Sequence, residues 1–209
     1  MKKQIKDILN ILENIYGGTE TALHFQTPFQ LLISTMLAAQ STDVRVNIVT
    51  KDLFHDCPTA EKMAALSLSE MEAYIKTVGL YHTKAKNVLA SSKILAEKYD
   101  GNVPDTREEF MKLPGVGRKT ANVVLSIAKG VPAIAVDTHV FRVSNRLGLA
   151  KANNVLDTEK QLMKNIPQAK WSDAHHWLIW HGRKICKARK PLCNECPLVA
   201  PCLFIRSDL

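Results

Sequence analysis

Residues 113–125 read LPGVGRKTANVVL, and this segment carries the strongest indication of how the chain folds. Gly115 and Gly117 stand two residues apart, which permits a tight turn with positive φ and the close approach of another backbone. The turn would join a helix that begins after Thr106 to a second helix that runs from Arg118. The N–H groups at the start of that second helix favour a DNA phosphate as ligand. A plain helix–helix turn is the alternative, because two glycines at this spacing are weak evidence by themselves.

Helical signals recur along the rest of the chain. An apolar stripe at helical spacing covers residues 5–16 and ends at a Gly-Gly pair. Thr27 followed by Pro28 is typical of an N-cap and a first helical position, and predicts a buried helix through about Ala39. Further helices are predicted over residues 43–54, 83–98, 118–128, 138–147 and 173–185.

Capping signals mark several helix boundaries. Three pairs fit the spacing of a capping box: Ser69 with Glu72, Thr106 with Glu109, and Thr158 with Gln161. Helix ends are predicted at Asp100-Gly101 and at Lys129-Gly130. The one β-leaning run, residues 131–136, contains a proline and is predicted to be an extended connector. The sequence therefore predicts an all-α fold of about ten short helices.

Composition narrows the class of protein. The chain has 209 residues, of which 46% are hydrophobic and 23% charged, so it can form a core and is not disordered throughout. Its net charge of +8 favours a polyanionic partner such as nucleic acid, although solubility alone is the alternative. The apolar run at 31–39 is too short to span a membrane, and Asp7 and Glu13 interrupt any signal-like segment. We expect a cytoplasmic protein, nucleoid-associated if bacterial, with no membrane partner.

Four of the five cysteines crowd near the C-terminus. Cys186, Cys193, Cys196 and Cys202 follow the pattern C-x6-C-x2-C-x5-C. Such spacing in a reducing compartment indicates a metal site, and four thiolates suit either an iron–sulfur cluster or zinc. Structural zinc sites more often have two separate C-x2-C pairs, so the spacing favours the iron–sulfur cluster. The remaining Cys57 is predicted to be a buried structural thiol.

Two residues near the glycine turn are candidates for chemistry. Lys119 would lie in the first turn of the helix from Arg118, where the helix dipole favours the neutral, nucleophilic amine over the ammonium ion. A solvated lysine that contacts phosphate is the alternative. Asp137 precedes the helix predicted over 138–147 and is expected to be its N-cap. The local sequence alone does not decide whether either residue is catalytic.

A basic segment surrounds the first cysteine of the cluster. It contains Arg183, Lys184, Lys187, Arg189 and Lys190 within eight residues. The segment is either a solvated charged surface or a loop that contacts DNA phosphates. We favour the second interpretation because a metal cluster would close the loop and hold its side chains in place.

Three motifs together resemble one family. LPGVGRKTAN at 113–122, VDTH at 136–139 and the C-x6-C-x2-C-x5-C pattern are similar to the endonuclease III family of helix-hairpin-helix DNA glycosylases with abasic-site (AP) lyase activity. The resemblance covers nearly the whole chain. It implies a helical-bundle domain at 23–130 ending in the hairpin, and a discontinuous domain of 1–22 plus 131–209 that holds a [4Fe–4S] cluster. DNA would lie across the cleft between the two.

The resemblance also implies an activity. The enzyme would remove oxidised or ring-damaged pyrimidines from double-stranded DNA and cleave the strand 3′ to the abasic site by β-elimination, acting as a monomer. Lys119 falls on the family's catalytic lysine, which forms a Schiff base, and Asp137 falls on its catalytic aspartate. Gln40 would fill the space left by the extruded nucleotide, Leu80 would intercalate, and His139 would line the lesion pocket. Without the resemblance, Gln40 would be a polar helix end and Leu80 a core residue. The remaining DNA contacts are expected at Leu113, Gly115, Val116, Gly117, Arg118, Arg183, Lys184, Lys187, Arg189 and Lys190.

Other functions fit the residues less well. The related adenine glycosylases, which act at A/G mismatches, have a catalytic glutamate where this chain has Ser34, and they lack a lysine at the position of Lys119. A non-catalytic helix-hairpin-helix DNA-binding protein would not need Lys119 together with Asp137. An iron–sulfur redox carrier explains neither the hairpin nor the positive charge.

Overall fold

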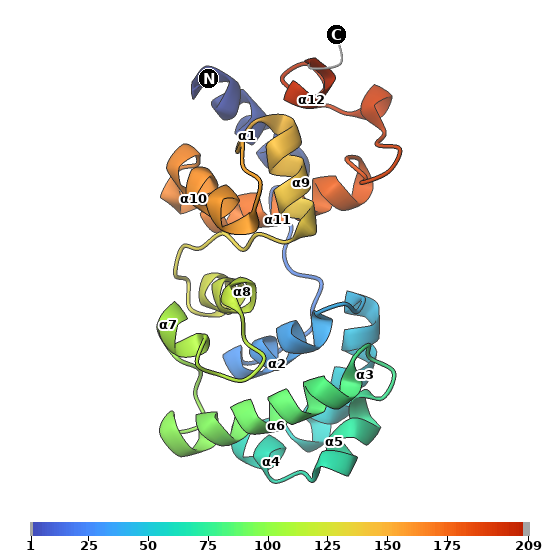
Figure 1. Ribbon diagram of the computed structural model, residues 1–209, viewed down its shortest axis with the longest axis vertical. Coiled ribbons are helices and arrows are strands. Elements are labelled where there is room, and N and C mark those ends of the chain that lie inside the picture. Colours follow the sequence, from blue (N-terminus) through green and yellow to red (C-terminus); the bar gives the residue numbers. More distant parts are fainter. Residues whose placement is uncertain (1, 207–209) are drawn as a thin grey trace. The chain divides into compact units, whose positions relative to one another are not determined.

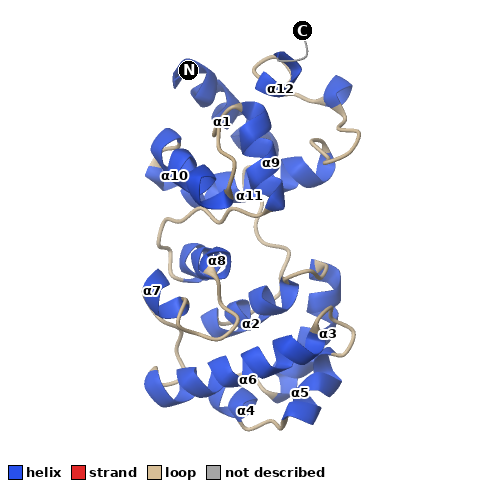
Figure 2. Cartoon of the chain, viewed as in Figure 1, coloured by secondary structure: helices blue, strands red, loops and turns tan. Residues whose placement is uncertain are grey.

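The fold was analysed in a computed structural model, which describes residues 2–206. Every regular element in that range is a helix, joined by turns and loops, as Figure 2 shows. The prediction of an all-α fold is therefore confirmed, and residues 131–136 are an extended connector without strand pairing. None of the helices in residues 2–206 has both the length and the hydrophobicity that crossing a membrane requires.

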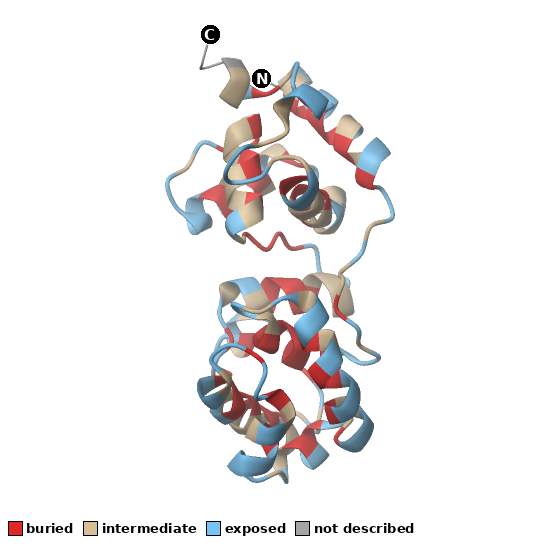
Figure 3. Ribbon diagram, turned by 90° about the vertical axis from the view of Figure 1, so that its right-hand side faces the viewer, coloured by how far each residue is buried: buried red, intermediate tan, exposed pale blue. Residues whose placement is uncertain are grey.

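The described chain divides into two compact units, and each has its own hydrophobic core. One unit runs from Ala22 to Val131, and the other combines the residues up to Thr21 with those from Pro132 onward. In both units the buried residues line the inner faces of the helices, as the colouring in Figure 3 shows.

The unit from Ala22 to Val131 is built around one central helix. Its elements are α2 (Pro28–Ala38), α3 (Asp43–Asp56), α4 (Ala60–Ala64), α5 (Leu68–Ile75), α6 (Tyr81–Lys98), α7 (Arg107–Phe110) and α8 (Arg118–Ala128) (Figure 1). Every residue of α2 from Phe29 to Leu37 is buried, as expected for a helix that is apolar on all sides. α8, α3 and α6 pack against α2, while α4 and α5 pack against α6.

The second unit joins the two ends of the described chain. Its elements are α1 (Lys2–Tyr16), α9 (Thr138–Leu147), α10 (Val155–Asn165), the 3₁₀ helix η1 (Gln168–Lys170), α11 (Trp171–Lys184), the 3₁₀ helix η2 (Cys193–Glu195) and α12 (Leu203–Arg206). α1 and α9 both pack against α11. The strong apolar stripe of α1 places Ile8 and Leu12 in the core together with Val143 and Trp177.

Most capping predictions hold. The Thr27 side chain accepts a hydrogen bond from Gln30 N, and Pro28 opens α2. Thr106 caps α7 through Glu109 N, and Asp137 caps α9 through Val140 N. Cys57 is buried at the end of α3, as predicted.

Two capping predictions are wrong in register. The capping box of α5 is formed by Ser67 and Glu70, two residues before the predicted pair of Ser69 and Glu72. The observed register buries Met71 and Ile75, so core packing selects between the two overlapping Ser-x-x-Glu strings.

The other error concerns the start of α10. Asn154 caps this helix through Asp157 N, and the predicted cap Thr158 lies inside it. The Thr158 hydroxyl donates to Asn154 O at 2.8 Å, which satisfies it within the helix.

Candidate active site

The glycine hairpin connects α7 to α8 and is held against the core by buried side chains and hydrogen bonds. Leu113 and Val116 are buried in the core, and their N–H groups donate to Phe110 O and Leu113 O at 3.0 and 3.1 Å. Because both side chains face the core, they position the hairpin, and only their backbone can approach a ligand. Ser91 on α6 donates to Pro114 O at 2.9 Å, which adds a polar anchor.

The two glycines of the hairpin have different surroundings. Gly115 has φ +77°, and a Cβ placed there would lie 2.7–3.0 Å from three atoms of the Asn87 side chain on α6. Gly115 is therefore required by both backbone conformation and packing. Gly117 has φ −94°, and a Cβ there would meet no heavy atom within 4 Å. Within this chain, nothing in the conformation or packing of Gly117 requires a glycine.

The start of α8 lacks a side-chain cap. Gly117 is its N-cap residue and supplies no side chain. α6 and α11 also lack a side-chain cap, whereas a Thr, Ser, Asp or Asn side chain caps α2, α3, α4, α5, α7, α9 and α10. The positive end of the α8 dipole is thus left for an external anion. Lys119 lies exposed in the first turn of α8, next to the half-buried Arg118.

Asp137 belongs to the other unit, at the start of α9. Its Oδ1 accepts a hydrogen bond from Val140 N at 2.7 Å, and the residue is half-buried. The cap uses only Oδ1, so capping is compatible with a further role for the carboxylate. His139, also half-buried, places Nδ1 3.2 Å from Arg142 Nη2, which packs it against α11 near Gly182.

Gln40 and Leu80 lie in two loops of the first unit. Both are exposed, Leu80 by 60%, so the interpretation of Leu80 as a core residue does not hold. Both also adopt left-handed backbone conformations, with φ of 55° and 58°. Gln40 follows Ala39, which is the C-cap of α2, and Leu80 immediately precedes α6.

Sequence reasoning missed Lys84, which is buried between these loops. It lies on α6 at helical spacing from the buried Val88 and Leu95, so the periodicity of the apolar stripe contained the signal. A charged residue at such a position needs acceptors that only the tertiary structure supplies.

The basic segment around Cys186 is braced from α9. Arg142 donates to Gly182 O and Cys186 O at 3.0 and 2.9 Å. Arg146 donates to Lys187 O at 2.8 Å and to Ala188 O at 3.2 Å. These two arginines were not predicted as part of the site, and the hydrogen bonds hold the loop rather than leaving it to solvent alone.

The five predicted basic contacts lie on this braced segment and are all exposed. Arg183 and Lys184 end α11, and their cationic groups lie 5.6 and 5.3 Å from the centre of the Trp180 ring. Lys187, Arg189 and Lys190 follow in the loop. All five charges are therefore accessible from solvent on a segment whose backbone is held by hydrogen bonds from α9.

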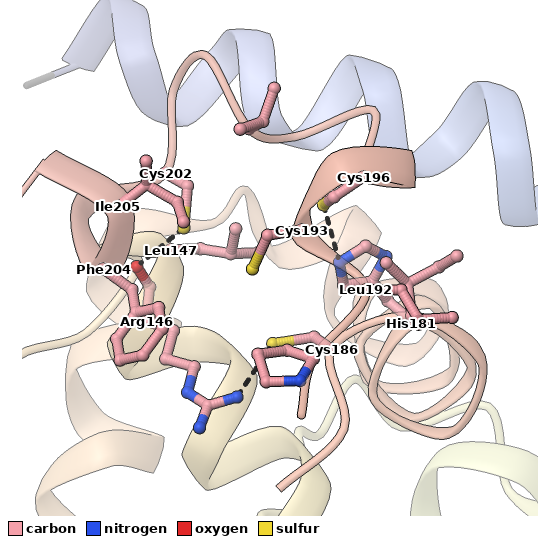
Figure 4. Close-up of a pocket in the computed structure, with 13 residues that line it drawn as sticks. Arg146, Leu147, His181, Cys186, Leu192, Cys193, Cys196, Cys202, Phe204 and Ile205 are labelled. Carbon is pink, nitrogen blue, oxygen red and sulfur yellow. Dashed lines mark hydrogen bonds between the residues drawn. The ribbon is translucent and has the colours of Figure 1, made fainter. Parts of the chain in front are cut away.

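The four C-terminal cysteines line one recess, shown in Figure 4. Its other walls are mostly apolar, with Leu147, Leu192 and Ile205 among them. None of the cysteines described forms a disulfide. Four thiols around one recess are a donor set that suits either zinc or an iron–sulfur cluster.

Polar groups of the protein reach the sulfur atoms. Arg146 Nη1 donates to Cys186 Sγ at 3.5 Å, and His181 Nε2 lies 3.6 Å from Cys196 Sγ. Burial lowers the pKa of His181 to about 4, so its ring is neutral and carries one N–H. The Tyr16 hydroxyl lies 3.2 Å from His181 Nδ1, at the other nitrogen of the same ring. A donor such as Arg146 aimed at sulfur suits a thiolate ligand.

Comparisons with known proteins agree with this site. Residues 33–168 match the profile of the HhH-GPD superfamily of base excision DNA repair proteins. The chain is 50% identical over 201 residues to the endonuclease III of Bacillus subtilis (strain 168), covering 96% of this chain and 92% of that protein. It is 46% identical over 202 residues to the endonuclease III of Escherichia coli (strain K12), covering 97% and 95%.

A solved structure matches as well. A trapped endonuclease III–DNA covalent intermediate has a TM-score of 0.94 and 48% sequence identity, over 100% of this chain and 98% of that one. The similarity covers the full length of the chain and agrees with the glycine hairpin and the exposed lysine at the start of α8. The chain therefore belongs to the endonuclease III family of the HhH-GPD superfamily.

Proposed function

We propose that this chain excises damaged pyrimidines from double-stranded DNA and then cleaves the abasic strand, with Lys119 as the nucleophile. As an endonuclease III it is a DNA glycosylase and AP lyase of base excision repair. The observation that carries the finer proposal is the start of α8, which offers an uncapped helix end and an exposed lysine in its first turn. The relative captured as a covalent DNA intermediate supports a covalent mechanism.

The chemistry follows from a primary amine. The neutral Nζ of Lys119 attacks C1′ of the extruded nucleotide, a C–N bond forms, and the base departs with the electrons of the glycosidic bond. The sugar ring then opens: the C1′–O4′ bond breaks as the nitrogen lone pair forms the C=N bond of an imine, and O4′ takes up a proton. The imine makes the proton on C2′ acidic. Loss of that proton expels the 3′ phosphate by β-elimination, and water then hydrolyses the imine and releases the lysine.

Asp137 supplies the negative charge that these reaction steps need. Its carboxylate can accept the proton that Lys119 loses, or stabilise the positive charge that develops on the sugar. The hydrogen bond from Val140 N to Oδ1 fixes the orientation of the carboxylate in either role.

DNA binding is shared among several surfaces. The capless start of α8 binds a phosphate of the strand, and Arg118 and the basic segment 183–190 add positive charge. Gln40 and Leu80 reach into the duplex, where they replace and separate bases around the extruded nucleotide. His139 lines the pocket that receives the lesion. The chain acts as a monomer on chromosomal DNA in the cytoplasm.

We assign the cysteine recess to a [4Fe–4S] cluster held by Cys186, Cys193, Cys196 and Cys202. When bound, the cluster supplies four covalent links that close the C-terminal segment; the lysine mechanism needs no redox step. Burial raises the pKa of the Cys196 thiol, so binding of iron must displace its proton. A purified protein that contains zinc and no iron would contradict this assignment.

The test compares base release and strand cleavage on defined duplexes. Wild type should release thymine glycol and cleave an abasic duplex, and Lys119→Gln should lose both activities while Asp137→Asn loses most of them. Lys112→Gln, an exposed lysine in the same hairpin, is the matched control and should act like wild type. Adenine release from an A/G mismatch, without action on thymine glycol, would favour the alternative assignment.

A further inference from the structure

Lys84 is a buried cation that faces the end of another helix. Only 7% of it is exposed, although it lies near the start of α6. Its Nζ donates to Leu37 O at 2.8 Å, to Ala39 O, and to Ser41 Oγ at 3.2 Å. The ammonium group therefore satisfies the carbonyls at the C-terminus of α2, where the helix dipole also favours a cation.

Keeping this lysine buried is costly. Burial lowers the pKa of Lys84, because a low-dielectric surrounding disfavours the charged form. The three oxygens that accept its hydrogens offset part of that cost, and all three come from residues 37–41. Lys84 thus provides hydrogen-bond donors to the C-terminal end of α2 and to the loop that follows it, which an apolar residue at this position could not do.

The loops next to Lys84 contain two strained residues. Gln40 and Leu80 are two of the four non-glycine residues in the described chain that have positive φ. Left-handed conformations of such residues persist only where surrounding contacts hold them, and they concentrate at functional sites. Both residues are exposed, Leu80 by 60%, so burial of their own side chains contributes little to holding them.

Ser41 connects the two loops to the lysine. Its Oγ accepts hydrogen bonds from Lys84 Nζ and from Gly79 N, each at 3.2 Å. The loops also touch directly, since a Cβ on Gly79 would lie 3.1 Å from Gln40 O. One buried ammonium group therefore holds the loop of Gln40 directly and the loop of Leu80 through Ser41.

We infer that Lys84 is a positioning residue that holds Gln40 and Leu80 in the conformations needed to extrude a damaged nucleotide. The inference rests on the proposed roles of Gln40 and Leu80 in DNA. Lys84 does not touch the substrate; it keeps the two loops ordered before DNA binds, so that binding does not have to order them. Its effect should fall on extrusion of the base and not on the chemistry of Lys119.

The variant Lys84→Met tests this separation. Methionine keeps an apolar stem of similar length and removes all three hydrogen-bond donors. For a duplex with thymine glycol, where the base must be extruded, we expect kcat/KM to fall about ten- to a hundredfold, because the competent loop conformation becomes a minor state. For an abasic site in single-stranded DNA nothing is extruded, and the rate should stay within about twofold of wild type.

Three further variants sharpen the experiment. Lys93→Met removes an exposed lysine of the same helix and should match wild type on both substrates. Lys84→Arg retains donors at this position and should recover part of the duplex activity. Ser41→Ala removes the hydroxyl that accepts from both Lys84 Nζ and Gly79 N, and leaves the bonds from Lys84 to Leu37 O and Ala39 O. It should lower the duplex activity alone, and it gives the decisive result if Lys84→Met does not fold.

The outcomes separate the inference from the function on which it rests. A wild-type protein that acts on neither substrate would overturn the proposed function. Selectivity here means the ratio of activity on the thymine-glycol duplex to activity on the single-stranded abasic site. A wild-type ratio in Gln40→Ala and Leu80→Ala would refute the roles of those residues, and the inference with them. If those variants lose selectivity while Lys84→Met and Ser41→Ala keep it, or if both substrates suffer equally, Lys84 is not a positioning residue.

Discussion

Gly115→Ala should lower mainly the stability of the protein, and Gly117→Ala mainly its affinity for DNA, although the two glycines lie in one hairpin. Gly115→Ala forces a side chain into φ +77°, which costs about 1–2 kcal/mol. The new Cβ would also lie 2.9 Å from Cβ of Asn87, an atom that no rotamer change can move away. Overpacking of this kind adds about 1–3 kcal/mol, so the free energy of unfolding should fall by about 2–5 kcal/mol.

Gly117→Ala is the matched control for stability. Its backbone has φ −94°, and the added Cβ meets nothing within 4 Å. Because alanine is a poorer N-cap residue than glycine, we expect the free energy of unfolding to fall by at most about 1 kcal/mol, which is less than for Gly115→Ala. The same Cβ would stand at the capless start of α8, where the proposed phosphate binds, so affinity for an abasic duplex should fall about tenfold, or about 1.4 kcal/mol.

Two measurements on each variant check this pair. Chemical denaturation gives the free energy of unfolding, and a duplex titration at fixed salt gives the affinity. Equal stability of the two variants would show that contact with Asn87 does not constrain the hairpin. Wild-type affinity in Gly117→Ala would show that the phosphate does not approach this position.

Three further predictions concern packing, titration and the cysteine recess. Trp177→Ala empties a fully buried site and should lower the free energy of unfolding by about 3–5 kcal/mol, measured by denaturation. The Tyr74 hydroxyl donates to Asp56 at 2.6 Å and holds the pKa of Asp56 below its usual range, so the contact stabilises the fold until pH falls through that pKa. Tyr74→Phe should raise the pKa of Asp56, measured by NMR of its carboxyl group. An unchanged pKa would contradict the contact. Arg146→Met removes the donor to Cys186 Sγ and to the loop carbonyls, so the purified protein should retain less iron per chain.

Much of the fold could be predicted from short-range signals in the sequence. The stripe over 5–16 and the caps at Thr27 and Asp137 predicted helices that the structure places within a few residues, because these signals depend on neighbours in sequence. The single-turn helices α4 and α12 were not predicted, since so few residues show no periodicity. The register of α5 depended on burial of Met71, which is a tertiary effect.

The candidate site was accessible only in part. The hairpin, Lys119 and the cysteine spacing are contiguous strings, and a string can be recognised without a structure. Lys84 was missed because its acceptors lie more than forty residues away, at the end of another helix. Arg142 and Arg146 were missed for the same reason, since the carbonyls they bind belong to a loop that folds back onto α9.

Reduction with borohydride in the presence of an abasic duplex tests the role of Lys119 most directly. Borohydride converts an imine between enzyme and sugar into a stable amine, so wild type should give a covalent protein–DNA band whose modified peptide contains Lys119. Lys119→Gln should give no such band, while Lys112→Gln gives it in normal yield. A normal band from Lys119→Gln, or a modified peptide elsewhere in the chain, would contradict the assignment of the nucleophile.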